Sequence, residues 1–376
     1  MNSPKDILAE NDGLAARHAW KRTLKKLKHQ KDLIPLEAWE RACAQIPDDK
    51  RKSETDWFAR VHIEKPGYRD KEDVYPTSYF RGFHTEGPKQ ELKLARAMYL
   101  SYDIGFDDSQ IEQLAKFPEF PWIRDLHFSC IKPSARSLEL VFSRFPKLNR
   151  LRLDFIDLSE RAQFDALLNA PFVSTLRNLE LRWTSMNTRS LEKLLERFEP
   201  QQLEGLRLEQ ERLGSASGQV LARWPGLQYL NCLKISHDSC SDGVLTDEGV
   251  QILARSPSRG LISLHLMGEE ISDDAAIALG QSSLLNHIQA LDLSRNRISD
   301  SGLSALLAHP KIESLETLNL NYNRLGDASA KLISAHPGLP RLRTLRVSHN
   351  DFSEQGIELL ESSRLAQQVD KFRYYS

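Results

Sequence analysis

The stretch LETLNLNYNRL, residues 315–325, has close counterparts on either side of it in the chain. LISLHLMGEEI begins at residue 261, IQALDLSRNRI at 288 and LRTLRVSHNDF at 342, so the step is 27 residues each time. A fixed period of this length predicts a stack of similar units. Because such a stack presents a long, open face, the function is to be looked for first in its surfaces.

Each repeated unit contains two hydrophobic periods. Leu291 and Leu293 alternate with polar residues, as in a half-buried strand, whereas Leu303, Leu306 and Leu307 recur at helical spacing. The unit is therefore predicted to be strand, turn, helix. Neighbouring helices need about 10 Å of lateral room and parallel strands about 4.8 Å, so the stack must bend with its sheet on the inside. We expect a horseshoe.

A residue suited to cap a helix N-terminus precedes the helical half of six units. These residues are Ser159, Thr246, Ser272, Ser299, Gly326 and Ser353. An acidic residue follows each of them, at Glu160, Asp247, Asp273, Asp300, Asp327 and Glu354. A carboxylate in the first helical turn faces the positive end of the helix dipole, which favours helix starts at these positions.

The pattern resembles the leucine-rich repeat family, and the long unit, with LxxLxLxxNxL before SDxGLxxL, looks like its ribonuclease-inhibitor-like branch. In residues 315–325 the matching positions are Leu315, Leu318, Leu320, Asn323 and Leu325. Weaker copies begin at Ile123, Leu148, Leu176, Leu203 and Leu227. The resemblance implies an α/β solenoid of about nine or ten repeats over residues 91–376, with a parallel inner sheet and outer helices.

In the resembling family an asparagine of each turn hydrogen-bonds backbone groups and forms a ladder along the stack. Asn296, Asn323 and Asn350 fit that position. Other residues occupy it in earlier copies, so we expect the ladder to be interrupted and the turns to be looser at Thr184, Glu211 and Glu269.

Residues 1–90 do not repeat and are predicted to form a mainly helical cap region. Residues 14–31 are predicted to form an amphipathic helix, and residues 17–31 contain seven Lys or Arg and no acid. Such a helix typically covers the end of a solenoid, but its basic face could also contact an anionic membrane surface or phosphates. Residues 65–89 are rich in Pro and Gly and are predicted to be an irregular connector.

The composition is typical of a cytoplasmic protein. A formal net charge of −1 gives no general attraction to nucleic acid or membranes. The four cysteines are scattered, at Cys43, Cys130, Cys232 and Cys240. The charged start has no apolar signal core and no run reaches the length of a membrane span, although specialised bacterial secretion would leave no such signal.

Motifs of common enzymes are missing from the sequence, which has no phosphate-binding glycine loop, HExxH, CxxC or GxSxG. The densest polar group, ISHDSCSDG from Ile235, lies in an expanded repeat, where Leu230 and Leu264 are 34 residues apart. Close His, Asp and Cys side chains could bind a metal, but short insertions of Ser, Asp and Gly are more often loops. We therefore expect a projecting recognition loop, and no metal, cofactor or enzymatic activity.

The predicted concave sheet carries the candidate partner-binding residues. Its central row is predicted to be His127, Arg152, Glu180, Arg207, Asn231, His265, Asp292, Asn319 and Arg346. Arginine and aromatic residues on a rigid surface are typical anchors of protein interfaces. The predicted site comprises Arg150, Arg152, Glu180, Arg182, Trp183, Arg207, Tyr229, His265, Asn319, Tyr322 and Arg346.

These features predict a non-enzymatic scaffold that binds another protein on the concave face, as an adaptor, an inhibitor or a bacterial effector. Two alternatives stay open. One is a GTPase-activating protein, since one class of such proteins is built from long leucine-rich repeats. The other is a scaffold that associates with membrane or nucleic acid through the basic N-terminal helix.

Overall fold

The structure is a computed structural model of the 376-residue chain. It describes residues 60–64, 79–81, 97–101, 111, 120, 123–129, 132–237, 243–336, 339–369 and 371–373. Within these residues one parallel sheet of 13 strands runs in the order β13-β12-β11-β10-β9-β8-β7-β6-β5-β4-β3-β1-β2. From β3 onward each strand therefore pairs with the strand that follows it in the chain, as a stack of repeats requires.

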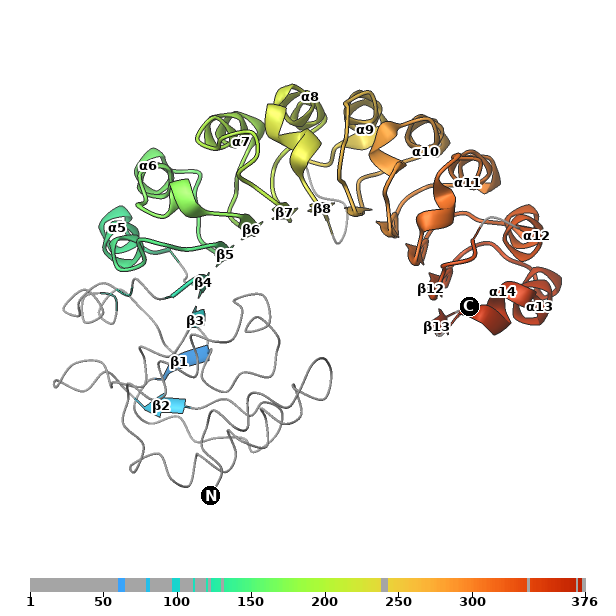
Figure 1. Ribbon diagram of the computed structural model, residues 1–376, viewed down its shortest axis with the longest axis horizontal. Helices are drawn as coiled ribbons and strands as arrows, with labels where there is room; N and C mark the ends of the chain where they lie inside the picture. The colour runs from blue at the N-terminus through green and yellow to red at the C-terminus, as the bar shows by residue number, and fades with distance from the viewer. Residues whose placement is uncertain are drawn as a thin grey trace, which may run out of the picture.

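The strands line the inside of an arc, which Figure 1 shows from β4 to β13. Their bounds are β1 Arg60–Glu64, β2 Tyr79–Arg81, β3 Ala97–Ser101, β4 Asp125–Ser129, β5 Arg150–Asp154, β6 Asn178–Arg182, β7 Gly205–Glu209, β8 Cys232–Ser236, β9 Ser263–Met267, β10 Ala290–Asp292, β11 Thr317–Asn319, β12 Thr344–Arg346 and β13 Lys371–Arg373.

The helices form the outside of the same arc (Figure 1). Their bounds are α5 Ala135–Ser143, α6 Arg161–Leu168, α7 Thr188–Leu195, α8 Ala216–Arg223, α9 Thr246–Ala254, α10 Asp273–Gly280, α11 Asp300–Leu307, α12 Asp327–Ala335, α13 Glu354–Ser362 and α14 Arg364–Gln368. Short 3₁₀ helices lie on some of the return paths to the sheet, at η5 Val173–Thr175, η6 Pro225–Tyr229, η7 Ser283–Leu285 and η8 Ile312–Ser314.

One continuous hydrophobic core lies between the sheet and the helices. In β5, Leu151 and Leu153 are fully buried, while Arg150 and Arg152, which alternate with them, face the inside of the arc. The helical leucines Leu303 and Leu306 bury against the same core. The predicted horseshoe of strand–turn–helix units is thus confirmed, and the alternation of side chains along each strand leaves one row of polar residues exposed on the inner wall.

The register predicted for β8 was wrong by three residues. The copy was placed at Leu227, but Leu233 pairs with Leu206 and Leu264. The correct copy begins at Leu230, because only that start gives the spacing LxxLxL, with Ile235 as the last buried position. The expanded repeat, counted from Leu233 to Leu264, therefore spans 31 residues and not 34.

The asparagine ladder forms as the family resemblance implied. Asn296 Oδ1 accepts hydrogen bonds from the backbone N–H groups of Glu269 and Ile271, at 3.0 Å each. Its Nδ2 donates to the carbonyl oxygens of Leu266 and Leu293. Asn323 and Asn350 repeat these contacts one and two units further on. The buried backbone of these turns is therefore satisfied by side chains.

The expected interruption of the ladder was wrong at Glu211 and Glu269. Glu211 is buried, and its carboxylate accepts hydrogen bonds from the backbone N–H and the hydroxyl of Thr184 and from the backbone N–H of Met186. Glu269 is fully buried and accepts from the backbone N–H of Leu245 at 2.8 Å. The carboxylates of Glu211 and Glu269 thus accept hydrogen bonds from the neighbouring turn, as the asparagine oxygens do. These turns are therefore fixed by buried hydrogen bonds.

A second ladder links the helix N-termini. Asp273 accepts from the backbone N–H and the hydroxyl of Ser299 in the next repeat, and these bonds lower its pKa although burial alone would raise it. Asp247, Asp300 and Asp327 bond the following cap in the same way. The acidic residues predicted to face helix dipoles therefore also join neighbouring units.

The predicted caps are correct at four of the six positions. Ser272, Ser299, Gly326 and Ser353 are the N-caps of α10, α11, α12 and α13. In α6 and α9 the helix begins one residue away from the prediction, with Glu160 and Leu245 as N-caps. In both cases the N-cap side chain makes no capping hydrogen bond.

Most of the predicted N-terminal cap region lies outside the described residues, including the basic helix at 14–31. The described parts of residues 1–90 are strands β1 and β2, and β1 pairs with β3. Strand β2 falls inside the predicted connector at 65–89. The boundary at residue 90 stays a prediction.

Candidate interaction surface

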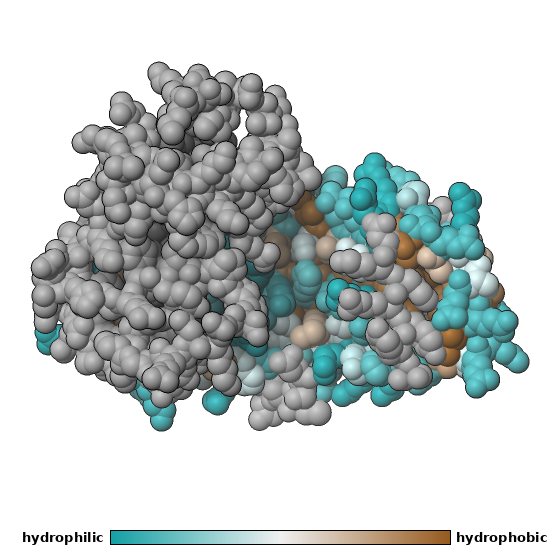
Figure 2. Space-filling model, turned by 90° about the horizontal axis from the view of Figure 1, so that it is seen from below, coloured by the Kyte–Doolittle hydropathy of each residue, from teal (hydrophilic) through white to brown (hydrophobic). Residues whose placement is uncertain are grey.

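The concave surface consists of the solvent-facing residues of β4 to β12. Every predicted site residue except Tyr229 lies on this surface or at its edge. Viewed into the arc, the described surface is mostly hydrophilic, with smaller hydrophobic patches between (Figure 2). The predicted site residues other than Tyr229 therefore share one surface. Their interactions with one another determine which of them can contact a partner.

Tyr229 and Asn231 were assigned to the concave surface wrongly. Both assignments followed from the misplaced start of β8. Tyr229 belongs to η6, and its ring lies 5.9 Å from the guanidinium carbon of Arg259. Asn231 precedes the strand, so the central row passes from Arg207 to Lys234, which is its register partner.

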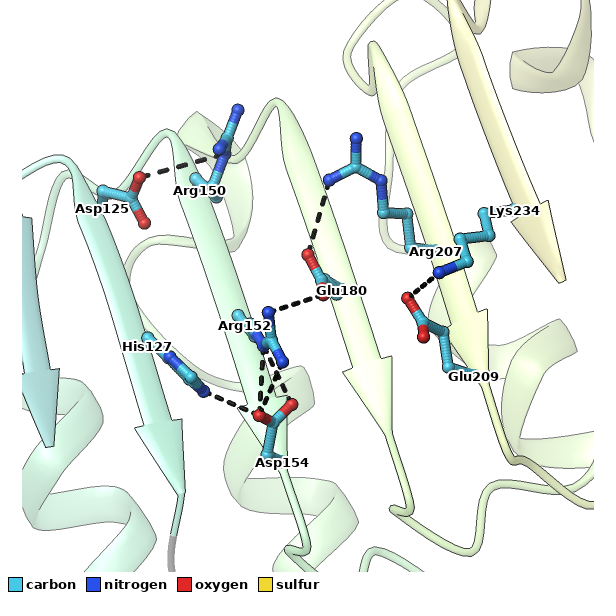
Figure 3. A network of polar contacts seen from close by, with 9 residues as sticks. All are labelled: Asp125, His127, Arg150, Arg152, Asp154, Glu180, Arg207, Glu209 and Lys234. Atoms are coloured by element: carbon cyan, nitrogen blue, oxygen red, sulfur yellow. Dashed lines mark hydrogen bonds and ion pairs between the residues drawn. The ribbon is translucent and has the colours of Figure 1, made fainter. Parts of the chain in front are cut away.

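Most cations of the N-terminal half of this surface are already paired with carboxylates (Figure 3). Arg152 donates from Nε and Nη2 to Asp154 at 2.9 to 3.1 Å, and its Nη1 lies 3.2 Å from Glu180. Glu180 also receives Arg207 at 3.4 Å, and Asp154 also contacts His127 Nε2 at 2.8 Å. This chain of contacts spans the four strands β4 to β7 and holds both arginines in place.

Two further pairs flank this chain of contacts. Arg150 Nε lies 3.9 Å from Asp125, and Lys234 Nζ lies 2.7 Å from Glu209. Both pairs join neighbouring strands, as Figure 3 shows. A partner that uses these cations must therefore compete with a carboxylate of the chain itself, which reduces the net gain from each new contact.

The pKa values of Asp154, Arg152 and Arg207 are each shifted in the direction that favours the charged form. Burial would raise the pKa of Asp154, but the hydrogen bonds from His127 and Arg152 lower it below its usual value. Burial would lower the pKa of Arg152 and of Arg207, but Asp154 and Glu180 beside Arg152, and Cys232 and Glu180 beside Arg207, raise both pKa values. The charges of the network are therefore stable at neutral pH.

Further along the sheet, Asp292 is satisfied by uncharged groups. It accepts from the backbone N–H and hydroxyl of Ser294 and from Asn319 Nδ2 at 2.9 Å. Burial would raise its pKa, but His265, whose Nδ1 lies 3.8 Å from Oδ2, and the hydrogen bonds from Ser294 and Asn319 lower the pKa to about 2. The predicted site residues His265 and Asn319 thus hold a carboxylate of their own chain.

Two arginines differ from the others. The Nε atoms of Arg182 on β6 and of Arg346 on β12 are buried, and within the described residues neither has a hydrogen-bond partner. Nor does either side chain form an ion pair in that part of the chain. An unsatisfied buried donor costs free energy, commonly about 1–3 kcal/mol, so neither guanidinium is fully satisfied by the described part of the chain.

The rim of the concave surface consists of the residues five positions after the first residue of a strand, except in the β8 repeat, where this position holds the fully buried His237. Its members include Phe155, Trp183, Gln210, Gly268, Arg295, Tyr322 and His349, and all have a left-handed backbone with φ between 54° and 72°. This conformation suits glycine and costs other residues about 1–2 kcal/mol.

Aromatic side chains gather at two places on the rim. Phe155 and Trp183 are 50% and 46% exposed, and their rings are parallel with centroids 6.4 Å apart. Tyr322 is 44% exposed and stacks on His349 at 4.2 Å, and the Arg295 guanidinium lies 4.8 Å from the tyrosine ring. We call these the N-terminal and the C-terminal rim cluster.

Sequence reasoning missed Lys234, Phe155, Arg295 and His349. The misplaced repeat hid Lys234. The other three occupy the same position of their repeats as Trp183 and Tyr322, which were predicted for their residue type. Aligning the repeats by position and then reading each column would have found them.

The comparisons agree with this geometry. Residues 285–307 and 311–334 match the family model described as Leucine Rich repeat. Together with the regular stack of parallel strands and outer helices, this match supports a leucine-rich repeat solenoid. The comparison with curated proteins gives no match.

Several solved structures are similar to this chain at low sequence identity. An internalin, inlF, from Listeria monocytogenes is 21% identical with a TM-score of 0.44, over 76% of this chain and 69% of that one. The yeast Rad7 and Elc1 complex gives 14% identity and 0.47, over 74% of each chain. The mouse RP105/MD-1 complex gives 15% and 0.41, over 84% of this chain and 54% of that one. These likenesses concern the fold alone.

Two further findings concern the described part of the chain alone. It contains no group of three or more His, Cys, Asp or Glu placed to hold a metal ion. The sequence predicts residues 238–242 of the expanded repeat to form a loop, with a metal site as the alternative. These residues lie outside the described part of the chain. No helix of the described part has the length and apolar character needed to cross a membrane.

Proposed function

We propose that the chain is a non-enzymatic scaffold that binds a partner protein on its concave surface. One observation carries this proposal. Arg182, a cation with an unsatisfied buried Nε, directly precedes Trp183, whose ring is exposed. Arginine and tryptophan are the residues most often found at the energetic centre of protein interfaces. We take this pair as the centre of the interface.

The internal ion pairs support Arg182 over its neighbours. Arg152 and Arg207 share Glu180, so a partner carboxylate would exchange one ion pair for another. At Arg182 the same carboxylate would meet a guanidinium that forms no ion pair among the described residues. The gain in free energy is therefore larger at Arg182.

We expect Arg182→Glu to weaken binding of the partner at least ten-fold, because the substitution removes the unpaired cation and repels a partner carboxylate. The measurement is affinity purification from the source cells, followed by titration of the partner that the wild-type protein retains. Arg161→Glu on α6 is the matched control, since it makes the same charge change on a side chain that is 94% exposed on the outer face.

The control variant should retain the partner with unchanged affinity. Equal retention by Arg182→Glu and the wild type would show that the concave surface is not the binding site. Loss of the partner from Arg161→Glu alone would instead place the interface on the helices.

We also infer membership of the ribonuclease-inhibitor-like branch. The observation that supports it is an α-helix on the outer side of each described unit, with 27 residues between most strands. A cytoplasmic location, and the roles of adaptor, inhibitor or bacterial effector, belong to this proposal. GTPase activation, and association with membrane or nucleic acid, stay predictions from the sequence that no contact among the described residues favours.

A further inference from the structure

The exposed Phe, Trp and Tyr side chains of the described residues all lie on the rim. They are Phe155, Trp183 and Tyr322, and each occupies the same position of its repeat with φ between 54° and 58°. The other large hydrophobic side chains exposed in that part of the chain are aliphatic and lie elsewhere, at Ile262, Ile277 and Leu359. Exposed aromatic residues are thus concentrated in one column.

The fold does not require aromatic residues in this column. Gly268 occupies the same position with φ 72°, which shows that the turn forms around a glycine. A bulky side chain there has a strained backbone and, being half exposed, gains little from burial. Strained residues that persist without a packing reason are typical of binding sites.

Each rim cluster lies beside one of the two arginines with an unsatisfied Nε. Arg182 directly precedes Trp183 of the N-terminal cluster, and Arg346 ends β12, which His349 of the C-terminal cluster follows. Two separate parts of the chain therefore repeat one combination, a stack of flat side chains with a cation that lacks a partner among the described residues. Such a combination fits a ligand that presents an aromatic ring next to a carboxylate.

The distance between the clusters sets the length of that ligand. Trp183 follows β6 and Tyr322 follows β11, so five strand steps separate them. At about 4.8 Å per step the arc between them measures on the order of 24 Å. An extended chain covers about 3.3 Å per residue, so roughly seven residues span the two clusters.

We infer that the rim binds an extended, acidic segment of a partner protein, which places one aromatic side chain on each cluster about seven residues apart and carboxylates against Arg182 and Arg346. The inference rests on the proposed function and specifies the chemistry of the partner. A protein segment is favoured over single-stranded nucleic acid because the cations on the wall between the clusters are already paired, Arg207 with Glu180 and Lys234 with Glu209, so the wall offers no continuous basic row for phosphates.

Labelled synthetic peptides test the inference with the full chain. The probe carries two Glu-Trp pairs whose tryptophans are seven residues apart in a Gly-Ser background, and a second peptide carries them three residues apart. We expect fluorescence anisotropy to show at least ten-fold tighter binding of the longer probe, because only that peptide reaches both clusters. Equal affinity for the two peptides, or no binding of either, overturns the inference.

Glycine variants separate binding from folding. Trp183→Gly and Tyr322→Gly should each weaken binding of the longer probe about ten-fold, while the midpoint of urea unfolding does not fall, since glycine relieves the left-handed backbone. Leu359→Ala, at an exposed position on α13, is the control and should bind as the wild type does. Unchanged binding by both glycine variants overturns the inference.

Two more arms distinguish the possible failures. If the native partner is lost from Arg182→Glu but bound normally by both glycine variants, the rim inference fails and the proposed function stands. If the native partner is retained by all three variants, both fail. A labelled 15-nucleotide oligouridine provides the nucleic-acid control. If the wild type binds it and Trp183→Gly does not, the ligand of the rim is a nucleic acid and the inference of a protein segment is overturned.

Discussion

Replacing Glu269 by alanine is expected to lower the free energy of unfolding by about 3–5 kcal/mol, the usual effect of removing one partner from a buried ion pair. Glu269 and His237 are both fully buried, and Oε1 lies 2.7 Å from Nδ1. His237 Nε2 lies 2.7 Å from the carbonyl oxygen of Glu211, to which it donates, so the Nδ1 proton lies between His237 and Glu269. Without the carboxylate, that N–H and the N–H of Leu245 lose their acceptor.

The adjacent residue provides a matched control. Glu270 forms an ion pair with Arg297 at 3.2 Å, but its side chain is 41% exposed, so Glu270→Ala should cost less than about 1 kcal/mol. Equilibrium unfolding in urea, followed by circular dichroism, measures both variants. A loss for Glu269→Ala no larger than that for Glu270→Ala would show that the pair with His237 does not stabilise the central repeats.

The buried pair of Glu269 and His237 also shows which part of the ladder could not be predicted from the sequence. The repeat alignment placed Glu211 and Glu269 correctly in the asparagine column, but an asparagine both accepts and donates, whereas a carboxylate only accepts. The missing donor comes from His237, which precedes the insertion and was considered only as part of a polar loop. Periodicity identifies the column, but it does not reveal which residue of an irregular repeat turns inward.

The horseshoe itself was predictable because it depends on features that recur. Pairs such as Leu151 and Leu153 in β5, or Leu291 with its partner Leu318, repeat the same spacing in each unit and leave one way to bury them. The error at β8 arose where the spacing is ambiguous. Leu227, Leu230 and Leu233 are each three residues apart, so the start of the strand could be placed at more than one of them.

The candidate surface was predictable in position but not in energetics. Arg152, Glu180 and Arg207 were placed in one row from the sequence, and the structure keeps them there. Whether an arginine is paired depends on neighbours both along and across the strands, as Asp154 and Glu180 are to Arg152. Residue type alone gives Arg152, Arg182 and Arg207 equal weight as anchors. The ion pairs of the structure distinguish them, because among the described residues Arg182 is the one of these three that has no ion pair.

The stability of the central repeats is expected to fall as the pH rises from about 4.5 to 8. Burial raises the pKa of Glu211 from its ordinary 4.5 to about 7, although the donors of Thr184 and Met186 limit the rise. Between these values the folded state keeps a proton that the unfolded state has released, so raising the pH favours unfolding. At about 1.4 kcal/mol per pKa unit, the full effect is about 3 kcal/mol.

His237 acts in the same direction. Burial would lower its pKa, but the hydrogen bond with Glu269 and the charge of that carboxylate raise it above the ordinary value. A base whose folded pKa is raised contributes stability that is complete below its unfolded pKa of about 6.5 and is lost as the pH passes through the folded value. Both groups therefore make these repeats more stable in mild acid than in mild base.

Comparing Glu211→Gln with the wild type isolates the contribution of Glu211, because titrations common to both proteins cancel in the difference. The free energy of unfolding of the wild type relative to this variant should decrease by about 3 kcal/mol between pH 4.5 and 8, in urea titrations at half-unit steps. Glu192→Gln on the exposed face of α7 gives the size of the effect that a change in net charge alone produces. A difference that grows with pH would mean that the three donors around Glu211 outweigh its burial, and that the carboxylate is the preferred form inside the fold.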